Sequence, residues 1–197
     1  MSEAPAQVPG PPARPARADA RRNYDRLVAA ATEAFSRDGF EASLDGIAKA
    51  AGVGPGTLYR HFPTRLSLLE AVYVEQVEQL REKADRLAAD LPPYEALDAW
   101  SRELALHGML FRGIKEFLAM DREGAGLSYC RGLLREAVAR LVQRAKDAGE
   151  IRTDADSVDI LRLLHGVSLS VDLMPEAERA AALGRLLDLV LAGLRPR

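Results

Sequence analysis

The sequence predicts an all-α protein. Apolar residues recur at helical spacing along most of the chain, as Leu27, Val28, Ala31 and Phe35 do in the first predicted helix. No alternating run of Val, Ile and Thr indicates a strand. Hydrophobic residues make up 48% and charged residues 28% of the 197 residues, which is ordinary for a globular protein and argues against a mainly disordered chain.

Capping and stop residues divide the chain into helices. They are Gly39, Ser43, Gly52, Thr64, Gly149 and either Asp154 or Asp156. Pro55 suits the first turn of a helix, and Pro175 opens the last one. The predicted helices cover residues 19–38, 44–51, 55–62, 65–90, 94–110, 114–120, 127–148, about 156–173 and about 176–194.

The expected organisation has three parts. Residues 1–18 are a flexible arm rich in Ala and Pro, residues 19–65 form a small helical domain, and residues 66–197 form a larger one. Residues 1–65 carry nine basic and seven acidic side chains, whereas the whole chain has 27 and 29, so the remainder has a net charge of −4. This asymmetry is a weak sign of a polyanion-binding head, and charge alone favours the other interpretation, a solvated, charged helix face.

Several classes of function find no support. Cys130 is the single cysteine, which rules out an internal disulfide and fits a reducing cytoplasm. The three histidines show no metal-ligand spacing, and neither a nucleophile–base motif nor a phosphate-binding glycine loop is present, so we expect no metal, no cofactor and no enzymatic activity. The absence of long apolar runs argues against a membrane span or a secretory signal.

The segment SLDGIAKAAGVGPGTLYRHFPTR, residues 43–65, predicts two short helices joined by a tight glycine turn. Ile47 and Ala48 are expected to face inward, and Leu58 and Phe62, four residues apart, set one face of the second helix on the core. Such a helix-turn-helix can place its second helix in a DNA major groove. The residues alone leave open an ordinary helical hairpin with a solvated polar face.

The motifs of residues 22–72 resemble the DNA-binding domain of TetR-family transcriptional regulators. The similar stretches are AxxAFxxxGF (31–40), SLDxIAKAAGV (43–53) and GTLYRHFPTR (56–65). The resemblance implies a three-helix helix-turn-helix domain at residues 19–65, followed by a ligand-binding and dimerisation domain at 66–197. The stretches LPPYEALDAW, AGEIRTDAD and LLDLVLAGLRP are similar to a bacterial subgroup of the family with unidentified ligands.

The resemblance also implies which residues contact DNA. They are Ser43, Thr57, Tyr59, Arg60, His61 and Arg65. Residues 57–61 would lie on the DNA face of the recognition helix, Arg65 would contact phosphate, and Ser43 would cap the preceding helix near the DNA backbone. Two positions depart from the family pattern: Gly54 replaces a frequent capping side chain, and Gly46 replaces a frequent acidic residue. Gly54 predicts a slightly frayed start of the recognition helix.

The last two predicted helices carry wide apolar stripes. These stripes can serve core packing within one chain or pairing with a second copy, and the resemblance implies a four-helix dimer interface. The residues assigned to it are Leu161, Leu164, Leu183, Leu187, Val190 and Leu191.

Aromatic and sulfur-containing residues gather between positions 94 and 130. They predict an apolar pocket for a small effector, although core packing accounts for such residues as well. The pocket residues are Trp100, Leu104, His107, Phe111, Phe117 and Met120.

The leading hypothesis is a ligand-responsive, dimeric repressor in a bacterial cytoplasm. It would bind a palindromic double-stranded DNA operator and be released by a small, largely apolar effector. The alternative is a helical carrier or adaptor that binds ligand or protein without DNA. Deletion of residues 1–65 distinguishes the two, because a carrier would keep its activity.

Overall fold

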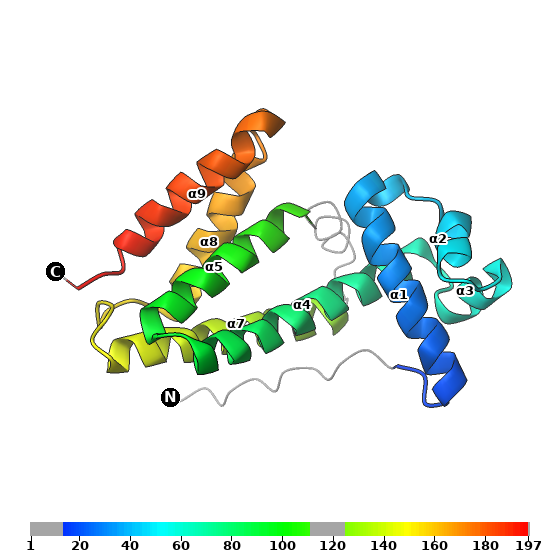
Figure 1. Cartoon of the computed structure of the whole chain (residues 1–197), viewed down its shortest axis with the longest axis horizontal. Helices are drawn as coiled ribbons and strands as arrows, with labels where there is room; N and C mark the ends of the chain where they lie inside the picture. Colours follow the sequence, from blue (N-terminus) through cyan, green and yellow to red (C-terminus); the bar gives the residue numbers. More distant parts are fainter. Residues whose placement is uncertain (1–13, 111–124, 197) are drawn as a thin grey trace. The chain divides into compact units, whose positions relative to one another are not determined.

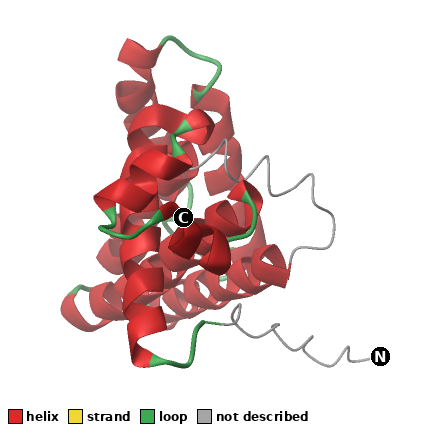
Figure 2. Cartoon of the chain, turned by 90° about the vertical axis from the view of Figure 1, so that its right-hand side faces the viewer, coloured by secondary structure: helices red, strands yellow, loops and turns green. Residues whose placement is uncertain are grey.

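The computed structural model describes residues 14–110 and 125–196, and every regular element in these two ranges is a helix (Figure 2). This confirms the all-α prediction. The predicted helix at 114–120 lies outside the described residues. The elements are α1 (Ala18–Asp38), the short 3-10 turn η1 (Gly39–Glu41), α2 (Leu44–Ala50), α3 (Pro55–His61), α4 (Arg65–Asp90), α5 (Pro93–Leu110), α7 (Ala125–Asp147), α8 (Ser157–Val171) and α9 (Glu176–Ala192) (Figure 1).

The helices begin where their capping residues stand. Ser43 Oγ accepts a hydrogen bond from the Gly46 amide at 3.2 Å, and Thr64 Oγ1 accepts one from the Ser67 amide at 3.0 Å. Asp156, rather than Asp154, caps α8, because its carboxylate accepts from the amides of the first helical turn at 2.8 and 3.0 Å. A side-chain acceptor satisfies amides that lack a partner within the helix, so each cap fixes a start.

The chain divides into two compact units. The first contains residues 14–77 and 125–131 of the described part, and the second contains residues 78–110 and 132–196. The first unit therefore continues past the boundary expected at residue 65. In it α1 contacts η1 and α2, and α2 contacts α3. The buried side chains that hold these helices together include Leu27, Val28, Ala31, Phe35, Ile47, Ala48, Leu58, Phe62, Leu68, Leu69 and Val72.

In the second unit α5 packs against α8 and α9, and α8 packs against α9 (Figure 1). Trp100 is completely buried, and its Nε1 donates to the Leu80 carbonyl at 2.9 Å. Arg102 joins α5 to α9 by donating to Asp98 at 2.8 Å and to Asp188 at 2.6 Å. These contacts fix the arrangement of the helices in this unit. Among the described helices, none has the length and apolar character needed to cross a membrane.

Candidate nucleic-acid interface

The turn between α2 and α3 depends on one glycine. Gly52 has φ +65°, a left-handed conformation that other residues adopt only with strain, and its amide donates to the Lys49 carbonyl at 3.0 Å. The next amide, of Val53, donates to the Ala48 carbonyl at 3.0 Å. A Cβ at position 52 would collide with the guanidinium of Arg26. The turn geometry predicted from the sequence is therefore confirmed.

Helix α3 presents polar side chains on one face and apolar ones on the other. Leu58 is 1% exposed, whereas Tyr59 is 49% exposed and Arg60 also faces solvent. Thr57 is half-buried. Gly54 offers no side-chain cap, and α3 begins at Pro55. Tyr59 and Arg60 are thus available for contacts outside the chain.

His61 is placed differently from the exposed residues of α3. It is half-buried, and its ring meets the Tyr24 ring edge-on, with 6.3 Å between centroids. Its Nε2 is buried and has no hydrogen-bond partner among the described residues. Burial, and secondarily the positive charge of Arg60, lower the pKa of His61 below its usual value, so the imidazole is neutral at pH 7. His61 is thus less exposed than Tyr59 and Arg60, and its assignment to the DNA contacts stays a prediction.

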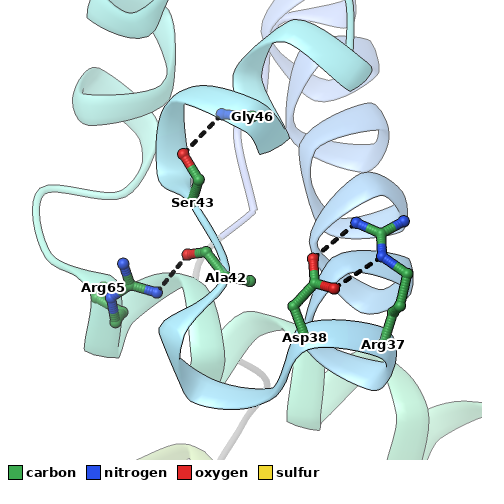
Figure 3. A network of polar contacts seen from close by, with 6 residues as sticks. All are labelled: Arg37, Asp38, Ala42, Ser43, Gly46 and Arg65. Atoms are coloured by element: carbon green, nitrogen blue, oxygen red, sulfur yellow. Dashed lines mark hydrogen bonds and ion pairs between the residues drawn. The ribbon is translucent and has the colours of Figure 1, made fainter.

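Arg65 connects the start of α4 to the start of α2. Its Nη1 donates to the Ala42 carbonyl at 2.7 Å, and Ala42 directly precedes the Ser43 cap (Figure 3). The same view shows Arg37 and Asp38 at the end of α1 joined by two hydrogen bonds of 2.8 and 2.7 Å. Arg65 is half-buried, so its role in the domain is partly structural.

Helix α1 contacts the chain on both sides of α3. The Tyr24 ring packs against Phe62 with centroids 5.0 Å apart, and Arg26 Nη2 donates to the Gly52 carbonyl at a long 3.4 Å. Arg17, the N-cap residue of α1, and Arg21 in its first turn are exposed.

Two models of known protein families match this chain. A family model described as bacterial regulatory proteins of the tetR family matches residues 27–72, and one described as the C-terminal domain of SbtR-like transcriptional regulators matches residues 92–196. The chain belongs to the TetR family of transcriptional regulators.

Individual TetR-family proteins are similar over most of the chain. The HTH-type transcriptional repressor KstR of Mycolicibacterium smegmatis is 30% identical over 87% of this chain and 86% of its own length. The HTH-type regulator UidR of Escherichia coli K12 is 26% identical over 89% of this chain and 94% of its own length. The crystal structure of a TetR regulator from Streptomyces coelicolor is 42% identical, with a TM-score of 0.74, covering 88% of this chain and 98% of that one.

The leucines that sequence reasoning assigned to a TetR-type dimer interface lie inside the second unit. Their exposed fractions are 7% for Leu161, 0% for Leu164, 2% for Leu183, 2% for Leu187 and 1% for Leu191. These five side chains pack within their own chain, and their assignment to a dimer interface stays a prediction.

Other leucines of the same two helices and of the turn between them are open to solvent, and Val190 is half-buried. The exposed leucines are Leu163 (52% exposed) and Leu169 (56%) on α8, Leu189 (71%) on α9, and Leu173 (87%) in the turn between the two helices. The apolar stripe of each helix is so wide that it includes both the buried and the exposed leucines. The sequence alone therefore could not show which leucines belong to the core.

The predicted effector-pocket residues are only partly visible. Trp100 and Leu104 are buried in the core of the second unit, and His107 is half-buried. Phe111, Phe117 and Met120 lie outside the described residues. The pocket assignment stays a prediction. Within the described ranges, no group of three or more His, Cys, Asp or Glu residues is placed to hold a metal ion.

Proposed function

We propose that this TetR-family chain is a ligand-responsive repressor that binds a palindromic operator as a homodimer, with α3 of each copy in the major groove. The observation that carries the proposal is the exposed pair Tyr59 and Arg60 on a helix whose opposite side is anchored by Leu58 and Phe62. A helix held in this way can present side chains to base edges in a fixed orientation.

The residues have different tasks in this proposal. Arg60 reads a guanine edge, because its guanidinium matches the two acceptors O6 and N7. Thr57 and Tyr59 contact phosphate through their hydroxyls, and Arg65 contributes positive charge at the start of α4. Ser43 orients the start of α2 beside the DNA backbone by capping that helix. His61 supports α3 from the α1 side and supplies little charge at pH 7.

Dimerisation follows from the symmetry of such an operator. Regulators of the TetR family act as dimers, and two recognition helices then meet half-sites about one helical turn, roughly 34 Å, apart. The exposed leucines of α8 and α9, together with half-buried Val190, supply apolar surface for the pairing. A two-fold interface buries the same patch on both copies.

Release by an effector requires a connection from the larger domain to α3. Helix α4 begins at Arg65 and continues without a break to Asp90. Within the first unit, Glu70 Oε1 on α4 accepts from the Gly126 amide at the start of α7, at 3.0 Å. A small, largely apolar effector that shifts α4 would change the spacing of the two recognition helices. Coupling between two such sites is typically about 1–3 kcal/mol.

Selection of bound fragments from random and genomic DNA tests the proposal. The purified full-length chain should enrich a palindrome, and footprinting should show protection of both half-sites. Arg60→Ala should lose the enrichment, whereas Arg185→Ala, an exposed arginine of α9, should keep it. Binding that never prefers one sequence over random DNA would favour the carrier or adaptor.

The effector is tested separately by calorimetry with and without saturating operator. Linkage requires that an effector which weakens operator binding is itself bound more weakly, by the same factor, when operator is present. Equal effector affinities would mean that the chain represses without a ligand switch. Regulation of this kind places the protein in the bacterial cytoplasm.

A further inference from the structure

The start of α1 carries two arginines whose side chains the protein itself does not use. Arg17 is the N-cap residue of α1, and the amide of Arg21 donates to its carbonyl at 2.9 Å, so the two residues lie one helical turn apart. Both side chains are exposed, and neither forms a hydrogen bond or an ion pair within the described part of the chain. Their guanidinium donors are therefore open to a ligand.

The other arginines of this segment are engaged within the first unit. Arg22 forms an ion pair with Asp19, and Arg14 forms one with Glu75 of α4 at 2.7 Å. Arg26 Nη2 donates to a carbonyl oxygen in the turn before α3, at 3.4 Å. Residues 17–26 contain four arginines and two aspartates, which leaves a net charge of +2. The unused part of this charge lies at the very start of the helix.

Arg21 lies on the face of α1 that contacts the end of the recognition helix. Residues three apart share a helix face, so Arg21 comes directly before Tyr24 on it. The Tyr24 ring packs against Phe62, the C-cap residue of α3, with 5.0 Å between ring centroids. A helix rises about 1.5 Å per residue, so Arg21 lies about 4.5 Å and Arg17 roughly 10 Å beyond Tyr24 along the axis of α1. Both arginines therefore follow the end of α3 within the same unit.

This position fits the backbone of a DNA duplex whose major groove holds α3. The recognition helix has seven residues and is about 10 Å long, whereas the major groove is about 12 Å wide between its two phosphate backbones. Side chains just past the end of such a helix reach the border of the groove, where phosphates lie, rather than base edges. A guanidinium matches phosphate oxygens with two parallel, charge-assisted hydrogen bonds.

We propose that Arg17 and Arg21 bind DNA phosphates that flank each half-site, as a second contact region beside α3. The proposal rests on the regulator function proposed above, because it concerns the same bound DNA. Phosphate contacts carry no direct sequence information, so these two arginines should raise the affinity for every duplex without changing which sequence is preferred.

The salt dependence of binding to a 40-base-pair duplex of random sequence tests the phosphate contacts. Each contact contributes about 0.9 to the slope of log affinity against log salt concentration. The double variant Arg17→Gln/Arg21→Gln should therefore flatten the slope by about 1.8 per bound chain. At 100 mM salt it should lower the affinity by roughly 10-fold to 100-fold.

Two further variants separate charge from structure. Arg17→Lys/Arg21→Lys keeps both charges and should keep the salt slope. Arg22→Gln is the matched control, because Arg22 is an exposed arginine of the same turn that is already paired with Asp19, and it should bind as the unmodified chain does. Glutamine is a good helix former, so the helical circular dichroism should be the same for all of these chains.

Footprinting with hydroxyl radicals on the palindrome that the chain selects places the contacts on the DNA. The double glutamine variant should lose backbone protection beside each half-site and keep both the protection and the sequence preference within it. Arg60→Ala should show the reverse pattern, with weaker sequence preference and intact flanking protection on the same duplex.

Three results would overturn the proposal. They are an unchanged salt slope for the double glutamine variant, a loss of sequence preference in that variant, and an equal loss of slope in Arg22→Gln. Each of them leaves the regulator function standing as long as the unmodified chain selects a palindrome. An unmodified chain that selects no sequence would instead contradict the regulator function, so the two failures are told apart by the unmodified chain alone.

Discussion

Arg65 donates from Nη1 to the carbonyl oxygen of Ala42 at 2.7 Å, which ties the first residue of α4 to the residue just before the α2 cap (Figure 3). The bond spans 23 positions of sequence. A residue whose family resemblance implies phosphate contact thus also sets the position of α2 relative to α4 within the first unit. Its two roles can be separated by substitution.

Arg65→Ala should lower the affinity for operator and random DNA alike and flatten the salt dependence, because one phosphate contact is lost. It should also lower the free energy of unfolding by about 0.5–1.5 kcal/mol, since the hydrogen bond to Ala42 is gone. Arg65→Lys keeps the charge and should keep the salt slope. DNA affinity measured from 50 to 200 mM salt gives the salt slope, and urea unfolding gives the free energy of unfolding. An unchanged slope for Arg65→Ala would remove Arg65 from the DNA contacts.

Arg60→Ala should weaken specific binding by about 1–3 kcal/mol while leaving binding to random DNA nearly unchanged. The reason is its exposed position beside Tyr59, where a guanidinium can reach a guanine edge. Competition titrations with operator and random DNA measure the difference. An equal loss of affinity for operator and random DNA would show that Arg60 contacts phosphate only.

Gly52→Ala should destabilise the protein by about 1–2 kcal/mol, because alanine at φ +65° is strained, whereas the exposed Arg26 guanidinium nearby can move aside. Gly56→Ala is the matched control in α3, where an added Cβ meets nothing within 4 Å. It should stabilise the helix by up to about 1 kcal/mol. Chemical unfolding of both variants checks the prediction. Equal effects would mean that the turn tolerates another conformation.

The lowered pKa of His61 in the folded chain should make the free energy of unfolding depend on pH. Burial lowers this pKa in the folded chain, so below about pH 6.5 the unfolded chain takes up the proton first. Stability should therefore fall as the pH drops from 7 through the folded pKa and then level off. His61→Phe keeps a ring against Tyr24 and should show a smaller fall. NMR titration of the His61 ring protons measures the pKa directly, and a value at or above 6.5 would contradict the prediction.

Local features of the fold were predictable because the signals are local. Ser43, Thr64 and Gly149 act within one helical turn, and each marks a helix boundary in the structure. The inward side of the helix-turn-helix was also predictable, since Leu58 and Phe62 repeat at four-residue spacing.

Contacts between distant segments were not predictable from the same signals. Nothing in the sequence around His61 shows that Tyr24, 37 positions earlier, covers its ring. Leu187 and Leu189 look alike in sequence, yet one is 2% and the other 71% exposed. Helical periodicity gives the direction of a stripe, but its width depends on which neighbouring helices cover it.

The different exposure of Leu187 and Leu189 provides a test of the proposed dimer interface. Leu187→Glu places a carboxylate in the core of the second unit and should destabilise the fold by about 3 kcal/mol or more, whatever the oligomeric state. Leu189→Glu changes an exposed side chain, so the helical circular dichroism should stay while sedimentation shows a monomer with much weaker operator binding. Leu106→Glu, at a 44% exposed leucine of α5, is the control that should remain dimeric. If Leu189→Glu sediments as an unaltered dimer and Leu106→Glu does not, the pairing surface lies on α5 rather than on α9.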